Sequence, residues 1–64
     1  MRWSDVFEIA MGLADTHEGV DPQYVNFVDL GKWVMELEEF DDDPARCGEK
    51  VLEAIQMAWI EEVE

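Results

Sequence analysis

Three amphipathic stretches separated by turn residues predict a small, mostly α-helical protein. Apolar residues recur at helical spacing in the ranges 5–18, 29–39 and 44–61 of this 64-residue chain. Pro and Gly lie in the intervals between these ranges, where a helix has to stop. One run, residues 24–28, has the composition of a strand, and no second run of similar quality could pair with it. The sequence therefore predicts one domain, residues 1–64, of three helices with a short extended segment.

The first helix is predicted to run from about Asp5 to Glu18. Ser4 is a suitable N-cap, and the negative charge of Asp5 favours the positive end of the helix dipole. Gly19 supplies a left-handed stop, and Pro22 follows shortly after it. The expected apolar face of this helix consists of Val6, Ala10, Leu13 and His17.

Residues 24–28 are expected to form an extended connector that leads into the second helix. Asp21 and Pro22 begin the turn before this connector, and Asp29 is the expected N-cap after it. The helix is then predicted to continue to about Glu39, with apolar residues at i, i+3, i+4 and i+7. This apolar stripe consists of Leu30, Trp33, Val34 and Leu37.

The third helix is predicted to run from about Pro44 to Glu61. Asp43 would cap it, and Pro44 would occupy the first helical position, where proline is favoured. Trp3 and Trp33 are assigned to the same core as this helix. Three helices and one short extended piece around a single core are compatible with a helix-turn-helix or winged-helix-like arrangement. The expected core face of the third helix consists of Val51, Leu52, Ile55, Ala58 and Trp59.

The segment between the second and third helices, which we call the acidic stretch, runs from Glu36 to Asp43. Six of its eight positions are carboxylates, and the other two are the large apolar residues Leu37 and Phe40. We expect these two residues to anchor the segment to the core while the charges stay in water. The six carboxylates belong to Glu36, Glu38, Glu39, Asp41, Asp42 and Asp43.

The helix dipole divides the acidic stretch into two parts. The aspartates, residues 41–43, precede the predicted third helix, where negative charge is favourable, so stability explains them in part. The glutamates lie at the predicted last turn of the second helix, where each charge costs about a few tenths of a kcal/mol. A solvated acidic face is the plain alternative for any such charge run. The glutamates are the better indication of a functional surface, because stability alone would favour Lys or Arg there.

Clustered carboxylates on an exposed turn suit docking on a basic protein surface or weak binding of a hard cation. A calcium loop is not matched, because the fifth and sixth positions counted from Asp41 are Ala45 and Arg46. Carboxylates alone do not choose among Mg, Ca, Mn and Fe. The candidate metal ligands are the six carboxylates of the acidic stretch, and the candidate partner-binding residues are these six together with Asp29.

The charge balance restricts the possible partners of the protein. Seventeen Asp and Glu residues oppose four Lys and Arg residues, which gives a formal net charge of −13. Such a surface repels nucleic acid and anionic membranes, and it attracts basic protein surfaces or cations. No apolar run approaches the roughly 18 residues of a membrane span, and we expect a monomeric, cytoplasmic protein.

The sequence offers no constellation of residues typical of an enzyme, and no catalytic activity is expected. For His17, the one histidine, a partly buried structural role is favoured over a ligand or catalytic role. Cys47 is the one cysteine, which excludes an internal disulfide and a cysteine-based metal site. We expect Cys47 to be a packing thiol whose pKa is lowered somewhat by the nearby helix start.

Several short motifs, each weak alone and specific together, cover nearly the whole chain. They are Trp3-Ser4-Asp5, Glu8-Ile9-Ala10, Asp21-Pro22, Val25-x-Phe27-x-Asp29-Leu30, Trp33, Leu37-Glu38-x-Phe40-Asp41-Asp42-Asp43-Pro44, Glu49-Lys50-Val51-Leu52-Glu53-Ala54-Ile55 and Trp59. With these motifs the chain resembles the IscX family, small acidic accessory proteins of bacterial iron–sulfur cluster assembly. It departs from the family pattern at Gly31, Met35 and residues 45–48.

The resemblance implies a modified winged-helix-like fold that does not bind nucleic acid. It implies binding to the cysteine desulfurase IscS, on a basic surface near its active site, in competition with bacterial frataxin. It also implies weak binding of iron, Fe(II) or Fe(III), through acidic surface residues, and a role as iron donor or modulator of the desulfurase. The charge leaves a second hypothesis open, an acidic DNA-mimic inhibitor of a nucleic-acid-binding protein.

Overall fold

The computed structural model describes all of residues 1–64, and every regular element in it is helical. Three α-helices are present, α1 (Val6–Thr16), α2 (Phe27–Met35) and α3 (Glu49–Val63). Two single 3₁₀ turns, η1 (Pro22–Tyr24) and η2 (Pro44–Arg46), lie in the connections between them. The predicted three-helix domain is confirmed. No helix has the length and apolar character needed to cross a membrane.

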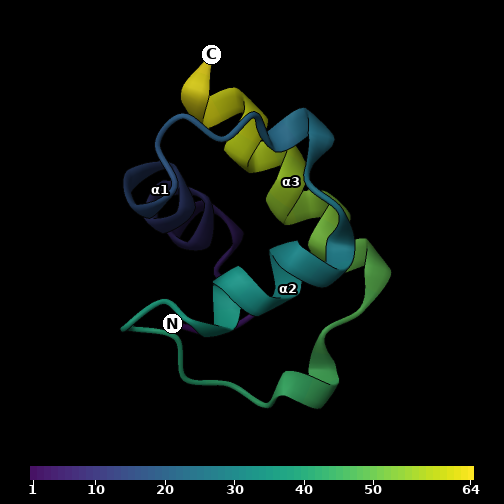
Figure 1. The fold of residues 1–64 in the computed structure, drawn as a ribbon. Helices are drawn as coiled ribbons and strands as arrows, with labels where there is room; N and C mark the ends of the chain where they lie inside the picture. Colours follow the sequence, from purple (N-terminus) through teal and green to yellow (C-terminus); the bar gives the residue numbers. More distant parts are fainter.

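The longest helix, α3, is the element against which the others pack. Its most extensive contact is with α1, while α2 and η1 also lie against it. Figure 1 shows α2 crossing below α3, and the chain from α2 to η2 running along the bottom of the molecule. The N-terminus lies beside this connection, and the C-terminus lies at the opposite end of the molecule. The connection that carries the acidic stretch is therefore close to the start of the chain.

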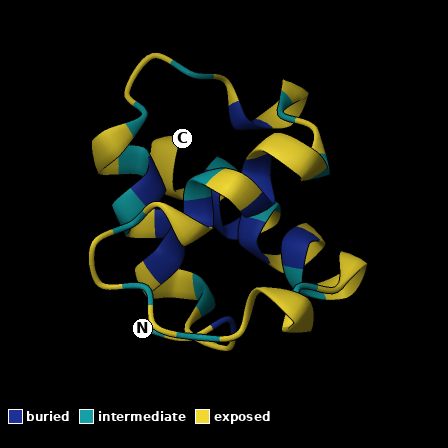
Figure 2. Ribbon diagram, turned by 60° about the horizontal axis from the view of Figure 1, so that its bottom comes forward, coloured by how far each residue is buried: buried dark blue, intermediate teal, exposed yellow.

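The core is formed by the inward faces of the three helices together with Trp3, which precedes α1 (Figure 2). Trp59 of α3 is fully buried at its centre, and replacing so large a buried side chain by Ala costs about 3–5 kcal/mol. The predicted apolar stripes are confirmed in their central positions, while Val6, Trp33 and Val51 are half-buried. The buried apolar residues are Trp3, Ile9, Ala10, Leu13, Leu30, Val34, Leu52, Ile55, Ala58 and Trp59.

The first helix is shorter than predicted at both ends. Asp5 is its N-cap, and the Asp5 carboxylate does not cap α1 but accepts the N–H of Arg2 at 2.8 Å. Ser4 lies in the preceding turn and is not the cap, contrary to the prediction. The helix ends at Thr16, with His17 as its C-cap. Gly19 has the predicted left-handed conformation, with φ of 86°.

The second helix begins earlier and ends earlier than predicted. Its N-cap is Asn26, whose side-chain oxygen accepts the N–H of Asp29 at 2.8 Å, so the prediction that Asp29 is the cap is wrong. Only Val25 and Asn26 remain of the predicted extended segment. The helix ends at Met35 and not at Glu39. Glu36 is its C-cap, and Glu38 and Glu39 lie beyond the helix.

The third helix begins five residues later than the predicted start at Pro44. Asp43 and Pro44 do form a cap and a first helical position, but of η2. Cys47 and Gly48 are extended, with ψ of 101° and 161°, and separate η2 from α3. The helix-start signal in the sequence was therefore real, but it starts a single turn and not the long helix.

Candidate partner-binding surface

The acidic stretch begins where α2 ends, and it folds into a tight turn. The N–H of Glu36 donates to the Lys32 carbonyl at 3.1 Å, and the N–H of Leu37 donates to the Val34 carbonyl at 3.1 Å. The N–H of Phe40 then donates to the Leu37 carbonyl at 3.0 Å. The glutamates are therefore displayed on this turn at the end of α2, and not on a continuous helix as predicted.

Leu37 and Phe40 anchor the acidic stretch to the body of the protein, which confirms the expectation for these two residues. Both are half-buried. The Phe40 ring packs edge-on against Trp3, with ring centroids 4.8 Å apart. Leu37 packs against α1 at Gly12, where an added Cβ atom would stand 3.4 Å from the Leu37 methyl carbons. The absence of a side chain at Gly12 lets the turn approach α1 closely.

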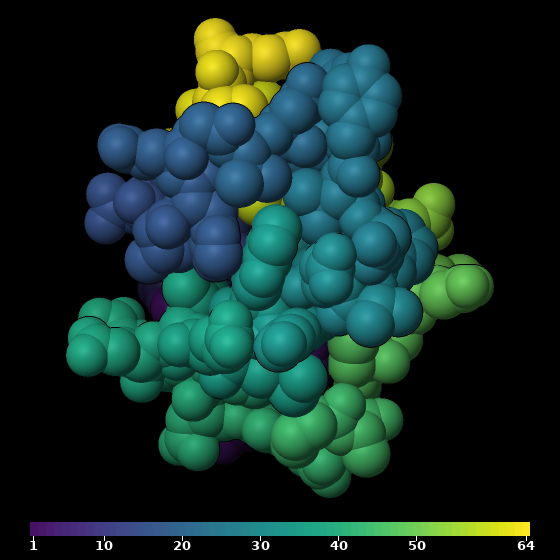
Figure 3. All heavy atoms as spheres, in the orientation of Figure 1, coloured from purple at the N-terminus to yellow at the C-terminus, as the bar shows by residue number.

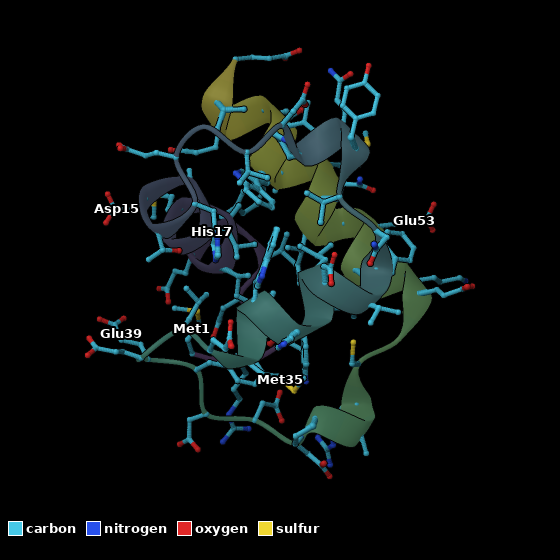
Figure 4. The ribbon with its side chains drawn as sticks, viewed as in Figure 1. Met1, Asp15, His17, Met35, Glu39 and Glu53 are labelled. Carbon is cyan, nitrogen blue, oxygen red and sulfur yellow. The ribbon has the colours of Figure 1, made fainter.

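The first residues of the chain hold the acidic stretch from another side, in an arrangement that we call the N-terminal clasp (Met1–Trp3 against residues 39–43). The Met1 ammonium donates to the Glu39 carbonyl at 2.8 Å, and the N–H of Asp41 donates to the Met1 carbonyl at 2.7 Å. The indole N–H of Trp3 donates to the Asp43 carbonyl at 2.9 Å. Figure 4 shows Met1 beside Glu39. The clasp joins residues 38 to 40 positions apart, a separation that no local sequence pattern indicates.

In the aspartate half of the stretch (Asp41–Asp43), two of the three carboxylates accept hydrogen bonds from the backbone of the protein. The Asp42 carboxylate accepts the N–H of Trp3 at 3.0 Å and the N–H of Asp43 at 2.7 Å. The Asp43 carboxylate accepts the N–H of Ala45 at 2.9 Å and caps η2. Asp41 is exposed, and its carboxylate has no such bond. Two of these three predicted site residues therefore have a structural role.

The electrostatics of Asp42 reflect this engagement. The hydrogen bond from the Trp3 N–H lowers the pKa of the Asp42 carboxyl, and the bond from the Asp43 N–H lowers it further. Desolvation opposes the shift, while the positive charges of Arg46 and Arg2 add to it. Two of the four Lys and Arg residues of the chain thus stabilise the charge of one aspartate.

The glutamate half of the stretch (Glu36, Glu38 and Glu39) is free of such contacts. All three residues are exposed, and no hydrogen bond within the protein reaches their carboxylates. They stand at or just beyond the C-terminal end of α2, where negative charge is unfavourable. Since these charges do not stabilise the fold, they are available to an external partner.

Asp29, the remaining candidate partner-binding residue, lies in the first turn of α2. Its carboxylate accepts the side-chain N–H of Asn26 at 3.2 Å, while its own N–H donates to the Asn26 side chain. This reciprocal pair is a capping arrangement. Asp29 and Glu36 are at opposite ends of the helix, about 10 Å apart along its axis. The structure therefore does not bring Asp29 together with the glutamates.

His17 packs as an aromatic group between α1 and α2. Its ring is half-buried and stacks on Trp33, with centroids 4.3 Å apart. An open hollow of about 230 Å³ adjoins the pair and is bordered by Glu36, Leu37 and Glu38. The packing agrees with the structural role expected for this histidine, and it places Trp33 next to the glutamate half.

The candidate metal ligands do not form a preassembled centre. No three His, Cys, Asp or Glu side chains lie where they could together hold a metal ion. Backbone N–H groups already bind the carboxylates of Asp42 and Asp43. The exposed carboxylates can offer a hard cation one or two oxygen ligands, with water completing the shell. Such an arrangement is suited to weak and exchangeable binding.

Cys47 is half-buried between η2 and α3, beside Gly31 of α2. A Cβ atom at Gly31 would lie 3.5 Å from the Cys47 sulfur. Burial raises the pKa of the thiol, so the expected lowering of this pKa is wrong. The reason is that α3 begins beyond Cys47, while the sulfur faces apolar neighbours. The expectation that Cys47 is a packing thiol agrees with this environment.

A groove that the sequence analysis missed adjoins the glutamate half. It measures about 650 Å³ and lies between α1 and the turn that follows α2 (Figure 3). Glu8 and Asp15 of α1 and Glu62 of α3 meet there with Glu38 and Glu39. The i, i+7 spacing of Glu8 and Asp15 was a visible signal that they share a helix face. Their meeting with Glu62 depends on the tertiary fold.

The fold and this surface define the class of the protein: it is small, acidic and helical, and it carries exposed carboxylates on one surface. A family model described as "Iron-sulphur cluster assembly" matches residues 1–64. An uncharacterised protein of Pseudomonas aeruginosa (strain PAO1) is 66% identical over 62 residues, which cover 97% of this chain and 94% of that protein. The chain therefore belongs to the iron–sulphur cluster assembly family, the IscX family.

Proposed function

We propose that this protein is a cytoplasmic accessory protein that binds the cysteine desulfurase IscS through the glutamate half of its acidic stretch. Membership of the family supports a role in iron–sulphur cluster assembly. The observation that carries the choice of surface is the freedom of the carboxylates of Glu36, Glu38 and Glu39: these side chains are exposed and accept no hydrogen bond within the protein. The protein acts by binding: it modulates the desulfurase or brings iron to it, and it catalyses no reaction of its own.

The charge of the protein determines how such binding would behave. A net charge of −13 directs the protein towards a basic surface and away from nucleic acid. Exposed charges of this kind mainly raise the association rate, so binding should weaken steeply as salt is added. The exposed carboxylate of Asp41 adds a fourth free charge beside the glutamates. Bacterial frataxin would compete for the same basic surface of the desulfurase.

Iron enters this proposal as cargo that the exposed carboxylates bind weakly. The glutamates and Asp41 are the favoured ligands, because the carboxylates of Asp42 and Asp43 already accept backbone N–H groups. One or two carboxylates with water give a site that exchanges its ion readily. Since the same carboxylates face the partner, bound iron and bound desulfurase influence one another through linkage.

The test is titration of the protein into purified desulfurase, with and without iron and frataxin. Replacing all three glutamates of the glutamate half by Gln should weaken binding by at least about tenfold. A matched control carries Glu49→Gln, Glu53→Gln and Glu61→Gln, the same change in charge on exposed positions of α3. Figure 4 shows Glu53 on the side of the molecule opposite Glu39.

Two results would contradict the proposal. If the wild-type protein does not bind the desulfurase at low salt, the desulfurase is excluded as its partner. Equal weakening by the test variant and the control would show that net charge, and not the glutamate half, is recognised. Circular dichroism of both variants checks that the helices are retained.

A further inference from the structure

The groove beside the glutamate half is lined by apolar and acidic residues, which we call its floor and its rim. The floor residues are Met1, Met11 and Leu37, and Gly12 also lines the groove. Met11 is 51% exposed, although it is a large apolar side chain. A volume of about 650 Å³ is within the usual range for pockets that bind ligands, and it can hold two or three side chains. The rim consists of Glu8, Asp15, Glu38, Glu39 and Glu62.

The groove follows from the way α1 meets the turn after α2. Glu8, Met11, Gly12 and Asp15 lie at i, i+3, i+4 and i+7, so they share one face of α1. Leu37 contacts this face at Gly12, where no side chain separates the two segments. The face is therefore open on either side of that contact. Glu62, near the end of α3, adds a carboxylate from a third part of the chain.

The electrostatics of the groove select the chemistry of an occupant. None of its lining residues is Lys or Arg, and the Met1 ammonium, the one cationic group of the lining, donates to the Glu39 carbonyl. No hydrogen bond within the protein reaches the rim carboxylates. A purely apolar occupant would desolvate these charges without a partner, which is costly. A bare cation would leave the methionine and leucine side chains in water. Nucleic acid, anionic lipid and a second copy of this −13 chain are all repelled.

We propose that this groove binds a basic segment of a protein partner, in which Lys or Arg residues flank one or two aliphatic or aromatic side chains. The apolar side chains lie on the floor, where the flexible Met11 adapts to their shape. The cationic groups pair with the rim carboxylates. A long Lys or Arg side chain can also lay its aliphatic part on the floor while its charged end reaches the rim. This inference rests on the proposed function in that it specifies what the partner presents next to the glutamate half.

The test uses three synthetic peptides of equal length, titrated into ¹⁵N-labelled protein and followed by NMR. The first alternates Arg with Leu, the second alternates Arg with Ser, and the third alternates Gln with Leu. The Arg–Leu peptide should bind at least about tenfold more tightly than either control, with shifts centred on Met11, Gly12 and Leu37. Equal binding of the Arg–Ser peptide, shifts centred elsewhere, or no binding of the Arg–Leu peptide would overturn the proposal.

Two matched pairs of variants separate the floor from the rim. Met11→Ala should weaken binding of the Arg–Leu peptide about fivefold, whereas Met57→Ala, at a position 63% exposed and outside the groove, should leave it unchanged. Glu8→Gln with Glu62→Gln should weaken binding more than Glu49→Gln with Glu53→Gln. Glu8 and Glu49 are matched because each lies in the first turn of its helix. Equal effects within either pair would contradict the assignment of the groove.

Failure here is distinguishable from failure of the proposed function, because the peptide test contains no desulfurase. If the peptide binds in the groove but the desulfurase does not bind, the groove stands and the partner is another basic protein. If the desulfurase binds and Met11→Ala leaves both interactions unchanged, the groove is excluded and the glutamate half alone carries the contact.

Discussion

The two halves of the acidic stretch carry three carboxylates each, but their surroundings differ. In the aspartate half, Asp42 and Asp43 accept three backbone N–H groups between them, and Arg2 and Arg46 are near enough to stabilise the charge of Asp42. In the glutamate half, all three side chains are exposed and none is hydrogen-bonded within the protein. The aspartates therefore organise the turn, and the glutamates are presented by it.

The difference shows that charge density alone does not identify a functional surface. What separates the two halves is the local supply of N–H donors: η2 and the N-terminal clasp offer donors to the aspartates, whereas the end of α2 offers carbonyls. Carboxylates beside donors stabilise the fold. Carboxylates beside carbonyls do not, so their presence calls for a functional explanation.

The largest effect is expected from removing the aromatic anchor between the two halves. Phe40→Ala removes the half-buried ring that packs on Trp3, and it should lower the free energy of unfolding by about 2–3 kcal/mol. Phe7→Ala is the control, because Phe7 is 74% exposed and its loss should change stability by less than about 0.5 kcal/mol. Urea denaturation measures both. Equal effects would mean that the clasp does not anchor the stretch.

A smaller effect on stability should distinguish Asp43 from Asp41. Asp43→Ala removes the cap of η2 and should cost about 1 kcal/mol, whereas Asp43→Asn keeps an oxygen acceptor and should cost less. Asp41→Ala removes no hydrogen bond and should be nearly neutral. Thermal denaturation of the three variants tests this order, and a cost at Asp41 as large as that at Asp43 would contradict it.

The dependence of stability on pH should come in part from Asp42. Its pKa is lower in the folded than in the unfolded protein, so its contribution is present in full above the unfolded pKa of about 4. As pH falls through that value towards the lower folded pKa, the contribution is lost. Asp42→Asn should therefore lose less stability than the wild type over this interval. Parallel acid-induced changes in both proteins would argue against the role of the Trp3 and Asp43 donors.

The smallest effect is expected from the glutamate half, and its sign is the informative part. Replacing Glu36, Glu38 and Glu39 by Gln should raise the free energy of unfolding by about a few tenths of a kcal/mol for each residue. The gain should shrink in high salt, since exposed charges are screened. A loss of stability would show that these side chains have a structural role after all. Denaturation at low and high salt provides the measurement.

The helices could be read from the sequence because each has a continuous apolar face, and the core residues of α3 were correctly assigned. Boundaries were less accurate where two signals competed. Asn26 and Asp29 are both good caps, and their reciprocal hydrogen bonds explain why either could be chosen. At Pro44 the start signal was real, but Gly48 interrupts the helix before α3. The local sequence does not determine which of two possible helix starts continues as a long helix.

The acidic stretch was located from the sequence, and so were its two anchors. The helix dipole also distinguishes the glutamates from the aspartates, although α2 is shorter than expected. What could not be predicted were contacts between distant residues: the clasp, and the meeting of Glu62 with Glu8 and Asp15. These depend on how α1 and α3 pack, and no spacing within one segment encodes that.

Trp33, whose indole stacks on His17, gives the protein an intrinsic fluorescent probe. Trp59 is fully buried, whereas Trp33 is half-buried beside Glu36 and Glu38. A partner that covers the glutamate half would exclude water from the Trp33 indole and shift its emission to shorter wavelength. The proposed association with the desulfurase could thus be followed by fluorescence without a label, provided that the desulfurase's own tryptophan emission is subtracted. A Trp33→Phe variant would identify the share of the signal that this residue supplies.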